Sequence, residues 1–241
     1  MAGNRAIFDR AMEQCRDASA QSRWEDALRA AVRALQEFPQ DVEARTAAAV
    51  ALFQTNRLDK ALQAFSDLHE ADPNNAFYIN YIAQCYRRQG NVAAAVEAYS
   101  ALADLHSAQR RSLQAAEALR ELLALQPELD DQRRRLAQLY EDIGAMAEAA
   151  ETHLELAQRL VAQNDPAAAL QEVEWALRLV PNHRVARELA NRLREQLGGQ
   201  TGAPALRGTT GFRPAYPTGM LRGSATQPEQ LIAEAIACQQ A

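Results

Sequence analysis

The apolar residues of this chain recur at intervals of three and four over most of its length, which is the spacing of one face of an α-helix. Two successive segments with this spacing end in prolines, Pro39 and Pro73. Apolar residues stand at matching distances before each proline, and these are Ala27, Ala31 and Ala34 in the first segment and Ala61, Phe65 and Leu68 in the second. The pattern predicts two helix pairs of equal length, over residues 8–41 and 42–75.

This pattern resembles the tetratricopeptide repeat, a helix-turn-helix unit of about 34 residues with fixed apolar positions and a closing proline. The resemblance implies that small residues at positions 8 and 20 of each unit let its two helices approach closely. Larger residues at positions 24 and 27 then pack beside them, and the proline ends the second helix.

The period changes after residue 75. A third unit has Ile82, Ala83, Tyr86 and Gly90 at positions 7, 8, 11 and 15, but Ser107 stands where its proline is due. Pro127 and Pro181 follow instead, each at an interval of 54 from the proline before it. Many positions agree at this offset, including Ala83 with Ala137 and Tyr99 with His153. We therefore predict two three-helix units, 76–129 and 130–183, in which Asn91 to about Arg110 forms one long helix.

The predicted fold is an all-α solenoid of tetratricopeptide-like helix pairs over residues 1–197. A capping helix at 183–197 completes it, and we expect Gly198 and Gly199 to end that helix. Three antiparallel helices in a unit would reverse the direction of each successive unit. Whether one groove continues across 76–183 is therefore open at this point.

The stretch from Gly198 to the end of the sequence differs in composition, because it holds seven of the ten glycines. Residues 198–227 are rich in Gly, Pro and Thr and predict a flexible linker, while 228–241 predict a short amphipathic helix. Two interpretations are open. The segment is either a linker with a frayed end, or a tethered ligand that docks on the repeats of this chain, a second copy or a partner through Phe212, Tyr216, Leu231, Ile232 and Ile236.

Composition narrows the class of function. Alanine is abundant and only 6% of residues are aromatic, which suits closely packed helices. The net charge of −5 argues against nucleic acid as the main partner. No apolar run long enough to span a membrane and no signal-peptide pattern occurs, so we expect a cytoplasmic protein that does not bind membranes.

Patterns that indicate catalysis or cofactor binding are absent from the sequence. Cys15, Cys85 and Cys238 have no disulfide or zinc spacing, and the four histidines have no metal-ligand spacing. His153 takes the place of Tyr99 in the other three-helix unit, which favours a packing role. No phosphate-binding glycine loop or nucleophile motif occurs. We therefore expect no enzymatic activity, no metal and no cofactor.

In the tetratricopeptide family, peptides lie along a concave wall formed by the first helices of the units. The resemblance assigns this role to Thr46, Phe53, Phe77, Asn80, Tyr81, Gln84, Arg87, Arg88, Arg134 and Gln138. For Phe77 and Tyr81 a core role is equally open. The carboxylate clamp of the chaperone-binding subclass is absent, because acidic residues such as Asp9 and Glu43 stand at the corresponding sites.

Arginine clusters at 87–88, 110–111 and 133–135 favour an acidic peptide as partner. Together these features predict a scaffold or adaptor that binds peptide segments or helices of partner proteins within a multiprotein assembly. The alternative is a regulatory subunit whose C-terminal segment occupies its own repeat domain, or that of a second copy, until a partner displaces it. If the segment occupies the repeat domain of a second copy, it would join two copies into a homo-oligomer.

Overall fold

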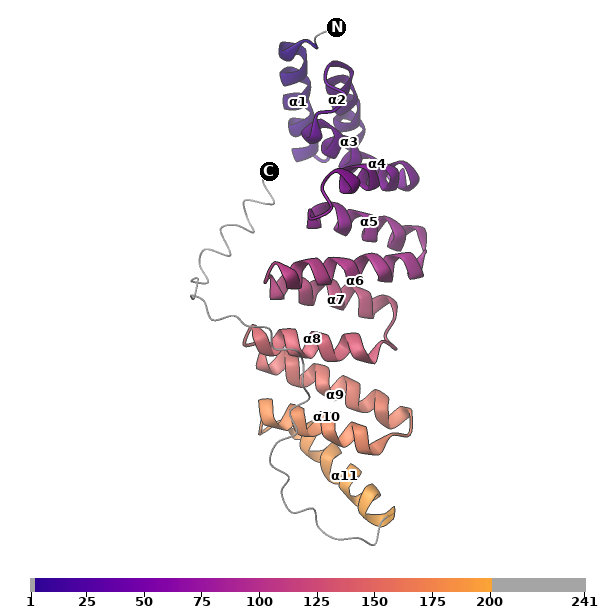
Figure 1. Cartoon of the computed structure of the whole chain (residues 1–241), viewed down its shortest axis with the longest axis vertical. Coiled ribbons are helices and arrows are strands. Elements are labelled where there is room, and N and C mark those ends of the chain that lie inside the picture. Colours follow the sequence, from indigo (N-terminus) through magenta and orange to yellow (C-terminus); the bar gives the residue numbers. More distant parts are fainter. Residues whose placement is uncertain (1–2, 201–241) are drawn as a thin grey trace. The chain divides into compact units, whose positions relative to one another are not determined.

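The computed structural model describes residues 3–200, and these form eleven α-helices and no β-strand (Figure 1). The all-α class predicted from the spacing of apolar residues is confirmed. The residues proposed for tail docking, Phe212, Tyr216, Leu231, Ile232 and Ile236, lie outside the described part of the chain, as does Cys238. Tail docking therefore stays a prediction.

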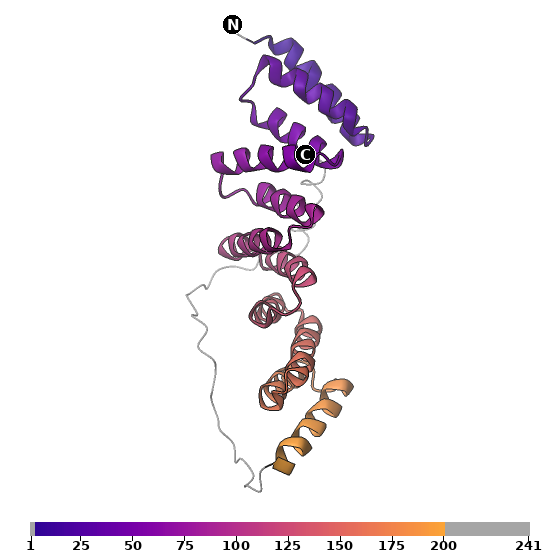
Figure 2. The same ribbon diagram turned by 90° about the vertical axis from the view of Figure 1, so that its right-hand side faces the viewer.

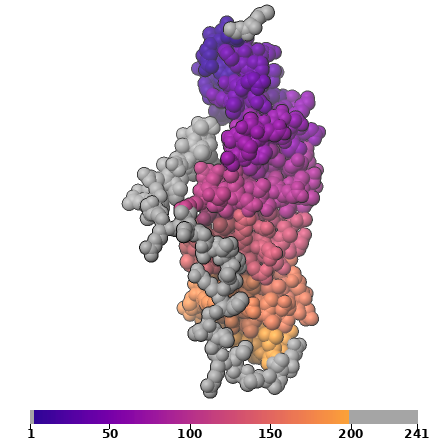
Figure 3. Space-filling view, viewed as in Figure 1, coloured from indigo at the N-terminus to yellow at the C-terminus, as the bar shows by residue number. Residues whose placement is uncertain are grey.

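Each helix packs against the next in chain order, and α1 also contacts α3 (Figures 1 and 2). The helices that match the first two predicted pairs are α1 (Arg5–Ala20), α2 (Trp24–Glu37), α3 (Val42–Gln54) and α4 (Leu58–Ala71). The remaining helices are α5 (Ala76–Gln89), α6 (Val92–Ala108), α7 (Ser112–Leu125), α8 (Asp130–Asp142), α9 (Met146–Ala162), α10 (Pro166–Leu179) and α11 (Arg184–Gln200). Side chains close the gaps that the ribbons leave between neighbouring helices (Figure 3).

Helices α5–α7, the first triplet, and α8–α10, the second triplet, have nearly the same lengths. The first triplet has helices of 14, 17 and 14 residues and the second of 13, 17 and 14. The long helix expected between Asn91 and about Arg110 is present as α6. The division of the chain into repeat units stays a prediction, but residues related by the longer sequence period lie at equivalent places in the helices of the two triplets.

Several of the turns between helices carry one residue with a left-handed backbone, and these residues recur at regular intervals. These residues are Ser22, Asn56, Gly90, Arg110, Gly144 and Asn164, with φ between 56° and 78°. Ser22, Asn56 and Gly90 are evenly spaced at the shorter sequence period, while Gly144 and Asn164 follow Gly90 and Arg110 at the longer one. The sequence periods therefore correspond to a recurring turn geometry, which glycine adopts without strain.

Small residues between the helices form the core. The alanine at position 20 of each segment is fully buried in every case, namely Ala27, Ala61, Ala95, Ala115, Ala149 and Ala169. Larger side chains one helical turn later, such as Phe65, Tyr99 and Leu119, are also buried beside them. This arrangement is the one that close helix packing requires, because an alanine at the contact lets the backbones approach.

The last helix differs from the prediction. Helix α11 continues to Gln200, so Gly198 and Gly199 do not end it at residue 197. A glycine ends a helix when it takes a left-handed backbone, and within residues 3–200 the glycines that do so are Gly90 and Gly144. The helix propensity of glycine alone costs only about 1 kcal/mol and does not fix a boundary. None of the helices in the described range combines the length and apolar content needed to cross a membrane.

Candidate functional site

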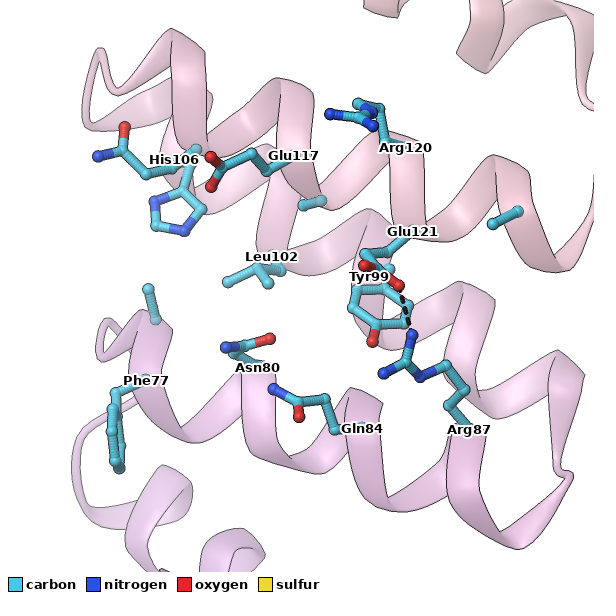
Figure 4. A pocket seen from close by; sticks show the side chains of 14 residues that line it. Phe77, Asn80, Gln84, Arg87, Tyr99, Leu102, His106, Glu117, Arg120 and Glu121 are labelled. Carbon is cyan, nitrogen blue, oxygen red and sulfur yellow. Dashed lines mark hydrogen bonds and ion pairs between the residues drawn. The ribbon is translucent and has the colours of Figure 1, made fainter. Parts of the chain in front are cut away.

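A groove of about 720 Å³ lies in the first triplet, and we call it the α5–α7 groove (Figure 4). Its walls are α5 and α7, and α6 contributes the floor. The lining residues are Ala76, Phe77, Asn80, Gln84 and Arg87 of α5, Tyr99, Leu102 and His106 of α6, and Gln114, Glu117, Ala118, Arg120, Glu121 and Ala124 of α7. Asn75 begins α5 by accepting a hydrogen bond from the Phe77 backbone amide, and spacings of three and four place the α5 lining residues on one helix face.

Amide side chains give the groove its hydrogen-bonding character. Asn80 and Gln84 are half-buried on the α5 wall, and Gln114 is an exposed lining residue of α7. Within the described part of the chain, Asn80 and Gln84 make no hydrogen bond through their side chains. Each carboxamide offers two donor hydrogens and an acceptor oxygen, so both can bond a peptide backbone.

An ion pair links the two walls. Arg87 of α5 donates to the Glu121 carboxylate of α7 at 2.5 Å, and the pair is visible as a dashed line in Figure 4. Both side chains are close to half exposed, so the pair stays open to solvent. It spans the groove near Tyr99 without burying a charge.

The floor supplies two uncharged polar groups. Burial raises the pKa of the Tyr99 phenol, with Arg87 acting in the opposite direction, so the hydroxyl remains a donor at neutral pH. Burial and the positive charge of Arg111 lower the pKa of His106, which keeps its imidazole neutral at neutral pH. His106 Nδ1 is buried and has no hydrogen-bond partner in the described structure.

An aromatic cluster borders the groove at Phe77. Tyr81 stacks on Phe65 with ring centroids 4.6 Å apart and contacts Phe77 at 4.8 Å and Phe53 at 5.1 Å. Phe77 is 44% exposed, whereas Phe53 and Phe65 are buried. Phe77 therefore packs in the core of α3–α5 and also lines the groove, and a binding role for it stays a prediction.

Four of the residues predicted for partner binding meet in the groove, and these are Phe77, Asn80, Gln84 and Arg87. Phe53 is a correction, because it is only 2% exposed and packs against the rings and side chains around it. Tyr81 is held among three other rings.

Thr46 and Arg88 stand away from the α5–α7 groove. The Thr46 hydroxyl lies 3.5 Å from the hydroxyl of Tyr78. Arg88 covers the Phe53 ring at 3.9 Å and donates to the Phe53 carbonyl at 3.2 Å. Neither residue lines the groove.

Arg134 and Gln138 belong to the second triplet, where the corresponding space holds a network of charged side chains. Arg134 Nε donates to Glu172 at 2.9 Å, and Nδ1 of His153 lies 2.8 Å from the same carboxylate. Gln138 donates to Asp142 at 3.1 Å. Helices α8 and α10 are thus joined by their own side chains through the pair of Arg134 and Glu172.

Ion pairs with neighbouring carboxylates neutralise most of the predicted basic patch. Arg133 is buried and donates to Glu155 and to the Pro127 carbonyl, both at 2.8 Å. Arg135 pairs with Asp104 at 2.6 Å. These arginines connect helices within the chain, so they do not by themselves support an acidic partner.

Sequence reasoning missed the α6 and α7 side of the groove. The family pattern points only to the first helices of its units, and here the opposite wall comes from the third helix of a triplet. A comparison of equivalent positions in the two triplets could have found it, because Ala118 corresponds to Glu172 and Glu121 to Trp175. Such differences mark a surface with different roles in the two triplets.

Groups that could bind a metal or act as nucleophiles are not assembled in residues 3–200. No set of three His, Cys, Asp or Glu side chains in that range is placed to hold a metal ion. Cys15 and Cys85 are buried free thiols. Burial raises the pKa of Cys85 to about 11, so it is protonated and unreactive at neutral pH.

The family model described as tetratricopeptide repeat matches residues 12–76. The resemblance recognised from Pro39, Pro73 and the residues before them is therefore confirmed over this segment, and the chain is a helical-repeat protein. The comparison with curated proteins gives no match.

Solved structures of several repeat proteins are similar to parts of the chain. A structure of PcrH in complex with the chaperone binding region of PopD is 18% identical, covering 51% of this chain and 92% of that chain, with a TM-score of 0.46. The P58(IPK) TPR domain is 14% identical, covering 81% and 67%, with a TM-score of 0.37. A tetratricopeptide repeat protein from Parabacteroides merdae is 14% identical, covering 78% and 99%, with a TM-score of 0.38. Likeness at this level identifies no function.

Proposed function

We propose that this protein is a non-catalytic scaffold or adaptor that holds an extended segment of a partner protein in the α5–α7 groove. The observation that carries the proposal is the pair of amides on α5. Asn80 and Gln84 face the groove without hydrogen-bond partners in the described structure, beside the half-exposed ring of Phe77.

An extended peptide is the ligand that suits these groups. Its backbone N–H and C=O groups are unpaired along both edges and need donors and acceptors when they leave water. The two amides lie one helical turn apart on the α5 wall, and Gln114 lies on the other wall. Phe77 offers an apolar contact at one end, where an aromatic side chain can anchor a bound segment.

The charges of the groove fit binding better than catalysis. Arg87 and Glu121 neutralise each other, and the His106 imidazole is neutral. No serine, threonine or cysteine is among the lining residues, so the groove lacks an aliphatic hydroxyl or a thiol that could act as a nucleophile. Tetratricopeptide repeats generally mediate contacts between proteins, which agrees with this role and leaves the partner to be found.

A selection experiment tests the proposal. Random 12-residue peptides displayed on phage are selected on the full-length protein, and selected peptides are then synthesised and titrated by fluorescence anisotropy. We expect the double substitution Asn80→Ala and Gln84→Ala to weaken binding at least tenfold, because it removes both free amides and breaks no internal hydrogen bond.

Gln158→Ala is the matched control, since Gln158 is an exposed amide on α9 outside the groove. It should leave the affinity unchanged. Selected peptides that bind the double variant as tightly as the original protein would refute the proposal.

A further inference from the structure

The second triplet contains a carboxylate where the first triplet has an open groove. Glu172 of α10 is only 8% exposed, and its two oxygens are bonded by Arg134 of α8 and His153 of α9. The equivalent position of the first triplet is occupied by Ala118 in the α7 wall. The groove therefore lacks the acceptor group that its counterpart supplies from within.

The donors around that place are nevertheless present in the first triplet. Asn80 stands at the position of Arg134 and Tyr99 at the position of His153, and both line the groove. The Asn80 amide and the Tyr99 hydroxyl have no hydrogen-bond partner within the described residues. The arrangement thus has two hydrogen-bond donors, and no carboxylate stands at the position of Glu172 to accept from them.

One charge near this place changes in the direction that favours an anion, while Arg134 is replaced by the neutral Asn80. Glu141 faces His153 at 3.5 Å in the second triplet, and Arg87 occupies the equivalent position in the first. A negative group is thus replaced by a positive one, which is close to half exposed and can bond a second carboxylate beside Glu121. Figure 4 shows Arg87, Tyr99 and Asn80 directed toward the same part of the groove.

We propose that the α5–α7 groove recognises a peptide through an acidic side chain placed over Ala118, where it takes the role that Glu172 has in the second triplet. This inference rests on the proposed function and adds the chemistry of the anchor residue. Asn80, Tyr99 and Arg87 bond the carboxylate, and Gln84 remains available for the peptide backbone.

Two synthetic libraries test the anchor. Both consist of acetylated and amidated nonapeptides with random uncharged residues around a fixed central residue, which is Glu in one library and Gln in the other. We expect the full-length protein to retain the Glu library at least tenfold better than the Gln library. In the Ala118→Glu variant this preference should disappear, because the chain then carries its own carboxylate.

Tyr99→Phe provides a second test that leaves the packing of the ring in place, and it should lower the preference for Glu several-fold. Gln158→Glu adds the same charge on the exposed face of α9 and should leave the preference intact. Circular dichroism confirms that each variant is folded.

The outcomes separate the two proposals. Equal retention of both libraries would overturn the acidic anchor while leaving peptide binding in place. Unaltered preference in both Ala118→Glu and Tyr99→Phe would also overturn it, since the carboxylate would then be recognised elsewhere. Retention of neither library would contradict the proposed function together with its anchor.

Discussion

Nδ1 of His153 on α9 lies 2.8 Å from the carboxylate of Glu172 on α10, and both residues are 8% exposed. Burial by itself would raise the pKa of Glu172, but the hydrogen bonds from His153 and Arg134 outweigh it and hold the pKa below its ordinary value. The ionised carboxylate is therefore stabilised by the fold and contributes to the stability of the second triplet.

This relationship predicts a pH-dependent effect of Glu172→Gln. A lowered pKa means that the stabilisation is present at neutral pH, above the pKa of the unfolded chain, and is lost as the pH falls through the folded value. We expect the variant to lose about 2 kcal/mol of unfolding free energy at neutral pH, the order of a hydrogen bond to a charged group. Urea denaturation at neutral pH and in acid measures the unfolding free energy of the original protein and of the variant. The difference between the two proteins should shrink toward zero in acid.

Asp131→Asn is the control for that experiment. Asp131 also pairs with Arg134, at 3.1 Å, but its side chain is 96% exposed. Exposed pairs contribute little, so we expect no measurable change at either pH. A Glu172→Gln effect that is the same at both pH values would show that the ionised carboxylate is not its source.

Turn residues with a left-handed backbone provide a second prediction. Arg110 and Gly144 share this geometry, with φ of 60° and 78°. Arg110→Gly should stabilise the protein by up to about 1 kcal/mol, because glycine relieves the strain, and Gly144→Ala should destabilise it by a similar amount. Thermal unfolding of the two variants checks that their unfolding midpoints shift in opposite directions. A shift of both midpoints in the same direction would contradict this account.

The aromatic cluster predicts a large cavity effect. Phe65 is fully buried and stacks on Tyr81, so Phe65→Ala should cost about 3–5 kcal/mol. Val185→Ala removes methyl groups from a side chain that is 50% exposed and should cost less than about 0.5 kcal/mol. Chemical denaturation compares the unfolding free energies of the two variants. Equal losses would mean that Phe65 does not pack as described.

The ion pair across the groove should matter little for stability. Arg87 and Glu121 are 42% and 48% exposed, and exposed pairs contribute about 0.2–1 kcal/mol. A double-mutant cycle with Arg87→Ala and Glu121→Ala measures their coupling energy. A value well above about 1 kcal/mol would show that the pair fastens the two walls together, which conflicts with an open groove.

Much of the fold follows from the sequence, because alanines at fixed distances before Pro39, Pro73, Pro127 and Pro181 fix both the helices and their contacts. The end of α11 did not follow, since Gly198 permits a helix to stop without requiring it. Phe53 was misplaced for a related reason. The family pattern gives its position a binding role, but here the Tyr81 ring and the Arg88 guanidinium pack against the Phe53 ring, and only three-dimensional packing shows this.

The groove was half predicted. The family pattern points to positions on α5, and Phe77, Asn80, Gln84 and Arg87 do line the groove, while their binding role stays a prediction. The opposite wall depends on how the third helix of a triplet faces the first, and single positions such as Ala118 have no distinctive chemistry of their own. The difference between Ala118 and the equivalent Glu172 becomes informative only when the two triplets are compared in space.

Hydrogen–deuterium exchange of the full-length protein with and without a selected peptide tests the central claim most directly. Peptide binding in the α5–α7 groove predicts slower exchange in residues 76–125, with exchange in α8–α10 unchanged. Protection centred on α1–α4 or on α8–α10, with residues 76–125 unaffected, would contradict the assignment of the groove as the binding site.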